Sequence, residues 1–322
     1  MPVEAVPQAK ITTVVTFPIN YFLENLAVRS DNSLLVTVLN HKELWFIPSS
    51  ESQPPVPLLL CRFEQCAMGI FEVEPDLFVI CSSNLWTTHD CFLHRLDLRG
   101  WSPGDPVQVR PLLELPSAAL GLNGACLIAP GVALVADSFA GLIWRIDMTP
   151  NALSAKASVW LEDPSMASLP HGPMPDQPGI NGLAYAAKTH YVYFTSTARQ
   201  LLMRVRVHPL TFEAAAAPEF VADGMMGDDL CLDEDSAMAY VTTHRQNTID
   251  RVRFEATTAG AERESVAGIP FTEELLGPTS GRWSRRPGEY GRVAYFLTDG
   301  GIKNPMPDGS LREARVLHVT LR

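Results

Sequence analysis

The chain has 322 residues, of which 46% are hydrophobic and 19% charged, so it can bury a large core and is unlike a disordered protein. The net charge is −11 and no run is rich in lysine or arginine, which argues against nucleic acid and a membrane surface as partners. No stretch is long and apolar enough to span a membrane, and the N-terminus lacks the pattern of a secretion signal. We therefore expect a cytoplasmic globular protein with reduced cysteines.

A strand, a polar turn and a second strand are predicted over residues 23–39, and a third strand over 43–47. This unit recurs along the chain at intervals of roughly 40 to 60 residues. The first strands of the six predicted units start at Asn25, Ala67, Gly124, Gly182, Asp229 and Thr279.

Between consecutive units lies a further run with the composition of a strand, which we assign as the fourth, outer strand of each unit. These runs cover residues 56–63, 107–115, 155–161, 218–222 and 262–269. The last unit has no such run after it, and residues 10–17 at the other end of the chain can supply it. The sequence thus predicts one all-β domain over residues 1–322, a six-bladed β-propeller with four-stranded blades closed by the N-terminal strand. A pair of β-sandwiches or a jelly roll is the competing architecture.

In a propeller the first strand of each blade lines the central channel, so residues at its start face the channel mouth. Four units carry a carboxylate or an amide at this place: Glu24, Asn123, Asn181 and Asp228. Oxygen ligands of this kind suit a divalent cation such as Ca²⁺, Mg²⁺, Mn²⁺ or Zn²⁺. Taken singly, each residue is also typical of a turn, and their shared position favours a site.

Three short motifs resemble the senescence marker protein/gluconolactonase family of six-bladed propellers. They are LENL at 23–26, NGL at 181–183 and GDDLCLD at 227–233, the last with Gly227 and Asp229 in place of the proline and glycine of the family pattern. The resemblance implies a divalent metal held by Glu24, Asn181 and Asp228, and a substrate-facing Asn123.

The predicted mouth loops are rich in large apolar residues, which favours a hydrophobic substrate over a sugar lactone. The candidate substrate-binding residues are Phe22, Trp86, Phe139, Met166, Met174, Met225, Met226 and Trp283, together with His171 in the long loop 162–179.

Segments 136–147 and 241–252 also resemble a fungal natural-product branch of these propellers that includes hetero-Diels–Alderase-like cyclases. This resemblance implies ring closure on a hydrophobic small molecule, which requires no cofactor. His244 and Arg245 lie just past the second strand of the fifth unit, where propeller geometry places them at the channel mouth, and with Asn123 they are the candidate polar catalytic groups. A metal-dependent lactonase and a non-catalytic binding propeller are the alternatives. A serine-hydrolase elbow and nucleotide-binding motifs are absent from the sequence, and the oligomeric state stays open.

Overall fold

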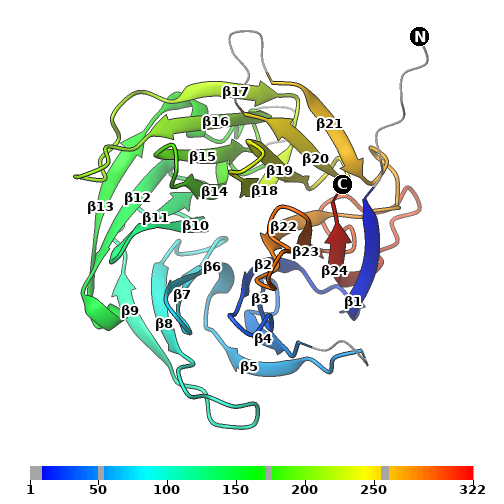
Figure 1. The fold of residues 1–322 in the computed structure, drawn as a ribbon, viewed down its shortest axis with the longest axis horizontal. Helices are drawn as coiled ribbons and strands as arrows, with labels where there is room; N and C mark the ends of the chain where they lie inside the picture. Colours follow the sequence, from blue (N-terminus) through cyan, green and yellow to red (C-terminus); the bar gives the residue numbers. More distant parts are fainter. Residues whose placement is uncertain (1–8, 50–53, 172–175, 255–260, 322) are drawn as a thin grey trace.

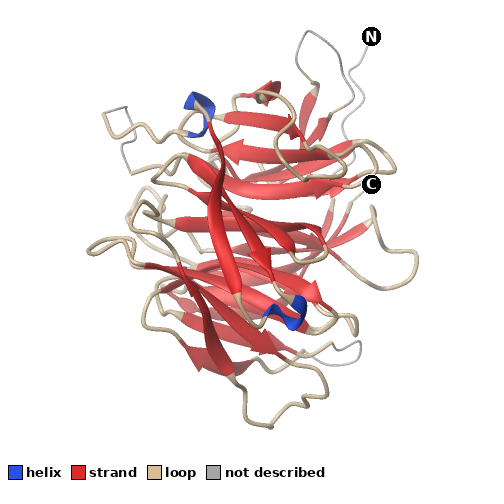
Figure 2. Ribbon diagram, turned by 90° about the vertical axis from the view of Figure 1, so that its left-hand side faces the viewer, coloured by secondary structure: helices blue, strands red, loops and turns tan. Residues whose placement is uncertain are grey.

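A computed structural model describes residues 9–49, 54–171, 176–254 and 261–321. It contains 24 β-strands in six four-stranded antiparallel sheets, which stand around a central axis as the blades of a propeller (Figure 1). In the described part of the chain the helices are two 3-10 turns, η1 (Pro150–Ala152) and η2 (Pro164–Met166), which Figure 2 shows in blue in a molecule built from strands. None of the described helices is long or apolar enough to cross a membrane.

Each blade runs from an inner strand at the axis to an outer strand at the rim, in sequence order except for the last blade. The inner strands are β2 (Leu23–Val28), β6 (Cys66–Glu74), β10 (Leu122–Ala129), β14 (Ile180–Ala186), β18 (Gly227–Asp233) and β22 (Pro278–Trp283). The second strands are β3 (Leu34–Val38), β7 (Leu77–Ser83), β11 (Val132–Asp137), β15 (Tyr191–Ser196), β19 (Met238–Thr243) and β23 (Val293–Thr298).

The third and outer strands complete the blades. The third strands are β4 (Glu43–Ile47), β8 (Cys91–Asp97), β12 (Leu142–Met148), β16 (Leu201–Arg206), β20 (Thr248–Arg253) and β24 (Glu313–Thr320). The outer strands are β5 (Leu58–Arg62), β9 (Val109–Glu114), β13 (Ala155–Glu162), β17 (Glu219–Asp223), β21 (Arg263–Ala267) and β1 (Lys10–Ile19). Strand β1 pairs antiparallel with β24, which confirms the predicted closure of the ring by the N-terminal strand (Figure 1).

Burial distinguishes the inner strands from the outer strands. Every residue of β2 and β18 is buried, whereas most residues of β13 at the rim are exposed or partly buried. Both faces of an inner strand are covered by neighbouring blades, so its sequence shows no alternation. The buried apolar side chains form clusters between adjacent blades, as where Leu26 and Val36 of blade one meet Val316 of blade six.

A β-bulge interrupts the pairing of every inner strand with its second strand, at the same place near the strand start. The register skips one residue, Glu24, in the first blade and two in each of the others. The skipped pairs are Met68-Gly69, Asn123-Gly124, Asn181-Gly182, Asp228-Asp229 and Thr279-Ser280. Bulges re-aim side chains next to functional sites. In blade six the bulge begins at Thr279.

Candidate functional site

The bulges direct side chains into a cavity of about 310 Å³ at one mouth of the channel, which we call the upper cavity. Its lining includes the first skipped residue of five blades: Glu24, Met68, Asn123, Asn181 and Asp228. The four polar residues singled out from the sequence therefore come together in one cavity. Residue Thr279 of the sixth blade instead donates its hydroxyl hydrogen bond to the Leu23 carbonyl, at 2.7 Å.

Below the upper cavity the channel is crossed by a buried polar cluster, which we call the waist: Asn25, Asp229, Ser280 and Arg282. The Asp229 Oδ2 atom accepts hydrogen bonds from Asn25 Nδ2 at 3.2 Å, Ser280 Oγ at 2.5 Å and Arg282 Nη1 at 2.7 Å. Blade four carries Gly182 at this level, where a Cβ atom would lie 2.5 Å from Asp229 Oδ1. Asp229 thus places its carboxylate in the waist, one residue after Asp228 in the chain.

The two carboxylates of the upper cavity are almost removed from solvent, with Glu24 4% and Asp228 5% exposed. Burial raises the pKa of Glu24 from 4.5 to about 8, and the negative charges of Asp229 and Asp299 add to the effect while Lys303 opposes it. Burial also raises the pKa of Asp228, and the charge of Glu24 is the second cause. Two carboxylates this close to each other and to further acids favour a bound cation or proton.

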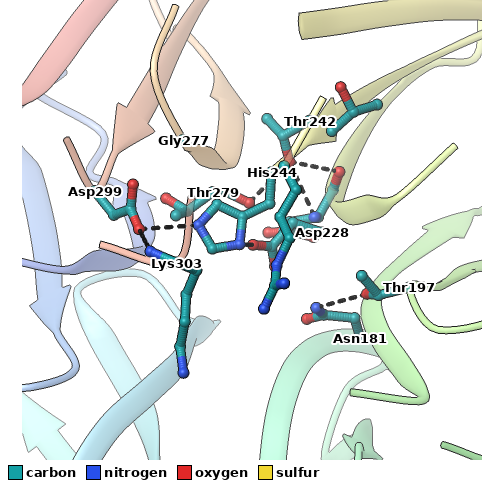
Figure 3. Close-up of polar contacts among 12 residues, drawn as sticks. Asn181, Thr197, Asp228, Thr242, His244, Gly277, Thr279, Asp299 and Lys303 are labelled. Atoms are coloured by element: carbon teal, nitrogen blue, oxygen red, sulfur yellow. Dashed lines mark hydrogen bonds and ion pairs between the residues drawn. The ribbon is translucent and has the colours of Figure 1, made fainter. Parts of the chain in front are cut away.

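His244 lies between two carboxylates on the wall of the upper cavity (Figure 3). Its Nε2 atom is 3.0 Å from Asp299 Oδ2, and its Nδ1 atom is 3.5 Å from Asp228 Oδ2. The Phe22 ring packs edge-on against the imidazole at 5.4 Å between ring centres. Two carboxylate partners fix the ring plane and make His244 a place where a proton can be held at the cavity wall.

Asp299 and Lys303 are site residues that the sequence reasoning missed. Asp299 is fully buried and accepts a second hydrogen bond from the Gly301 N–H at 2.7 Å, and Lys303 lines the cavity. The signal for Asp299 was available, because it follows the second strand of its blade as His244 does. Ser138 and Thr197 occupy the same position in blades three and four, and both line the cavity.

Both asparagines of the cavity are oriented by these hydroxyl groups. Asn181 Nδ2 donates to Thr197 Oγ1 at 3.0 Å, and Asn123 Nδ2 donates to Ser138 Oγ at 3.2 Å. Thr197 in turn donates to the Gly227 carbonyl at 2.6 Å. The other end of the Asn181 amide, Oδ1, is buried and has no hydrogen-bond partner among the described residues. An unpaired buried acceptor of this kind calls for a ligand.

Arg245 also lines the cavity, and an ion pair occupies its guanidinium. Its Nη2 atom donates to Asp176 Oδ2 at 2.6 Å, which joins the turn after β19 to the end of the long loop 162–179. The predicted position of Arg245 at the channel mouth is therefore what the structure shows, and its role as a catalytic donor stays a prediction.

One side of the cavity is apolar and comes from the first three blades. Of the substrate-binding candidates, Phe22, Trp86 and Phe139 lie on this side. The other apolar side chains of this wall are Leu39, Met68, Leu85 and Leu122.

Five of the predicted substrate-binding residues are not among the described lining of the upper cavity. Met166 is fully buried between blades three and four, and Met225 between blades four and five. Trp283 lies below the waist, in a cavity at the other mouth of the channel, and donates to the Leu232 carbonyl at 2.7 Å. The placement of these three at the upper mouth was wrong, because an apolar residue in a loop or at a strand end can equally pack into the core.

Two more candidates lie near the mouth without lining the cavity. Met226 is partly buried, and its backbone N–H donates to Gln246 Oε1 at 2.9 Å. His171 is exposed, as a solvated loop residue would be. Met174 lies outside the described residues.

The sequence matches no protein-family model and no curated protein. Solved structures match over nearly the whole chain. A luciferin-regenerating enzyme has a TM-score of 0.67 at 12% identity, covering 97% of this chain and 95% of its own. A calcium-binding regucalcin from Agrobacterium tumefaciens has a TM-score of 0.65 at 14% identity, covering 99% and 98%. The PQQ-bound aldose sugar dehydrogenase from Streptomyces coelicolor has a TM-score of 0.63 at 14% identity, covering 99% and 100%.

At these identities the likeness shows the fold alone, a six-bladed β-propeller. This likeness does not test the resemblance to the fungal natural-product branch, so ring closure stays a prediction. Function must be argued from the upper cavity itself.

Proposed function

We propose that the protein is a divalent-metal-dependent hydrolase that opens an ester or lactone of a hydrophobic small molecule in the upper cavity. The observation that carries this proposal is the Asn181 Oδ1 atom, which is buried without a hydrogen-bond partner among the described residues. The Asn181 amide interacts with Asp228, and the charge of Glu24 acts on the same carboxyl. A divalent cation would satisfy the amide oxygen and neutralise both carboxylates.

The donor set fits a hard cation rather than a soft one. Its three members are oxygen ligands from blades one, four and five, the preference of Ca²⁺, Mg²⁺ and Mn²⁺, with Zn²⁺ also able to use them. A metal site in this cavity needs the Asn181 amide as its third ligand, because among the described residues no group of three or more His, Cys, Asp or Glu side chains is placed to hold a metal ion. That the regucalcin neighbour is described as calcium-binding supports the same assignment.

Ester hydrolysis joins the oxygen of a water molecule to the carbonyl carbon, breaks the bond to the alkoxy oxygen, and returns a proton to that leaving oxygen. A bound metal polarises the carbonyl and lowers the pKa of water. His244, held between Asp228 and Asp299, can take the proton of the attacking water and deliver it to the leaving group. The apolar wall orients the substrate and excludes bulk water.

The test measures metal binding and hydrolysis on the same preparation. Protein treated with EDTA is titrated by calorimetry with CaCl₂, MgCl₂, MnCl₂ and ZnCl₂, and the hydrolysis of aryl esters and aromatic lactones is followed with each metal. We expect one site per chain, activity only with metal, and loss of both in Glu24→Gln. Glu114→Gln, on the exposed outer strand β9, is the matched control. A folded Glu24→Gln protein with full activity would overturn the proposal.

Ring closure on a hydrophobic substrate is the second candidate, and the apolar wall of the cavity favours it. Phe22, Trp86 and Phe139 can press a flexible apolar molecule into a reactive geometry while His244 polarises a carbonyl. This reaction needs no metal, so activity on a polyene or quinone methide precursor that survives EDTA would favour it over hydrolysis. A non-catalytic propeller that binds another protein through its mouth loops needs no cavity in the channel, and the 310 Å³ cavity favours a small-molecule site over it.

A further inference from the structure

The upper cavity is divided by polarity. The apolar wall comes from blades one to three, whereas the basic side chains His244, Arg245 and Lys303 all come from blades five and six. A ligand that fills this cavity therefore meets apolar contacts on one side, and acidic and basic side chains on the other.

Only one of these three groups is without a counter-ion among the described residues. Arg245 is paired with Asp176, and His244 lies between Asp228 and Asp299. Lys303 is exposed, and its ammonium group makes no hydrogen bond or ion pair with the described part of the chain. In Figure 3 its side chain extends away from Asp299.

The loop that carries Lys303 is held in place by its own contacts. Asp299 accepts hydrogen bonds from the Gly301 N–H at 2.7 Å and the Lys303 N–H at 3.4 Å. Asn304 Nδ2 donates to the Arg245 carbonyl at 3.1 Å, which ties the loop to the turn of blade five. Lys303 also lowers the pKa of Glu24, so its charge acts on the interior of the cavity.

We propose that the ligand of the upper cavity is an amphipathic anion, with an apolar body against the wall of blades one to three and an ionised acidic group bound by Lys303. The inference rests on the proposed function in taking this cavity as the substrate site. An ammonium group without a counter-ion from the protein can form a charge-assisted hydrogen bond with an acidic group of the ligand. The aliphatic part of the lysine side chain can at the same time pack against the apolar body of the ligand. The substrate class is then an ester or lactone that carries a separate carboxylate or similar acid.

Binding of two matched probes tests this inference without any turnover. Naphthalene-1-acetate and naphthalene-1-acetamide share the apolar body and differ in charge, and their affinities are measured by calorimetry in EDTA, so that no metal can hold the carboxylate. We expect wild-type protein to bind the anion about fivefold more tightly, the size of one partly exposed charge contact. Added NaCl should reduce this ratio.

Variants assign the preference to Lys303. Lys303→Gln should bind both probes equally, and Lys303→Glu should prefer the amide. Lys156→Gln, which removes the same charge from the exposed outer strand β13, should keep the wild-type ratio. If Lys303 serves only to offset the charge of Glu24, the ratio will not change in Lys303→Gln, and the inference is overturned. It is also overturned if wild-type protein binds neither probe or binds both equally.

The outcome separates this inference from the hydrolase proposal. Metal-dependent hydrolysis of neutral esters, without preference for the anionic probe, would leave the hydrolase standing and remove the anionic substrate class. A preference that depends on Lys303, in a protein that hydrolyses no ester with any metal, would keep the anion site and overturn the hydrolase.

Discussion

Glu24 and Asp228 show how single residues in this molecule oppose its stability. A carboxyl group prefers water, and both groups are buried beside other acids. The structure keeps them because the bulges of β2 and β18 leave these side chains no direction but the cavity. Buried acids with raised pKa values are typical of functional sites, since a bound cation can offset the free-energy cost of burying the carboxylates.

We expect the metal-free protein to lose stability as the pH rises from about 5 to 8. The pKa of Glu24 is about 8 in the folded state against an ordinary value of 4.5, so the folded protein binds more protons than the unfolded chain in this range, and unfolding becomes easier as the proton leaves. Thermal unfolding in EDTA should show Tm falling by several degrees. The slope should shrink in Glu24→Gln and persist in Glu114→Gln; equal slopes in both variants would contradict the assignment.

Gly277 offers a second test at the residue scale. Its φ is +65°, and a Cβ atom would lie 1.8 Å from Asp299 Oδ1, so alanine there must displace the carboxylate that holds His244. Gly288 has φ +77° and open space around it, so Gly288→Ala measures the backbone strain alone, about 1–2 kcal/mol. Gly277→Ala should cost about 1–3 kcal/mol more in urea unfolding, because the clash adds to that strain. Equal losses would show that Asp299 moves freely.

At the scale of the strand, the bulges leave backbone N–H groups without a partner strand, and threonine hydroxyl groups accept their hydrogen bonds. Thr195 and Thr242 accept from the backbone N–H of the second bulge residue in blades four and five, and Thr37 accepts from the N–H of Asn25, just after the bulge of blade one. Each threonine then donates to a carbonyl of the next inner strand. One hydroxyl group therefore joins two blades at the level of the site.

Removal of one such hydroxyl should weaken the ring measurably. In Thr242→Val the Asp229 N–H and the Thr279 carbonyl lose buried partners that lie at 3.0 and 2.8 Å. We expect a loss of about 1–3 kcal/mol in the free energy of unfolding, measured by urea titration. The same change at Thr16, exposed on β1, should cost less than about 0.5 kcal/mol. Similar losses at both positions would show that the hydroxyl bridge contributes nothing.

The strands were predictable from the sequence because each is a short apolar run between turn residues, and the outer run 155–161 differs from β13 by one residue. The bulges were not predictable, because a bulge is a property of the register between two strands, and Asn-Gly or Asp-Asp is equally typical of a turn.

The misplaced Trp283 shows the consequence of missing a bulge. It follows the bulge of β22 by a few residues, at about 3.3 Å each, which carries it past the waist to the other mouth of the channel. Asp299 was missed because the units were aligned on their first strands alone.

At the scale of the molecule, the ring depends on one contact between its ends. Blade six takes its outer strand from the N-terminus, and the β1–β24 pairing extends from Lys10 to Ile19 on one side and from Glu313 to Thr320 on the other. Because every blade packs on two neighbours, an opened ring would expose the sides of blades one and six. The upper cavity draws residues from both, so ring closure also holds the site together.

Phe17 is the side chain of β1 that tests this closure. It is 3% exposed and packs edge-on against Trp45 of blade one at 5.4 Å between ring centres, so it joins the last blade to the first. Phe17→Ala should lower the free energy of unfolding by about 3–5 kcal/mol, and amide hydrogen exchange should quicken in both β24 and β3. Ile19→Ala, on the same strand at 57% exposure, should change neither quantity beyond about 0.5 kcal/mol. Faster exchange confined to β1 would mean that the strand frays without opening the ring.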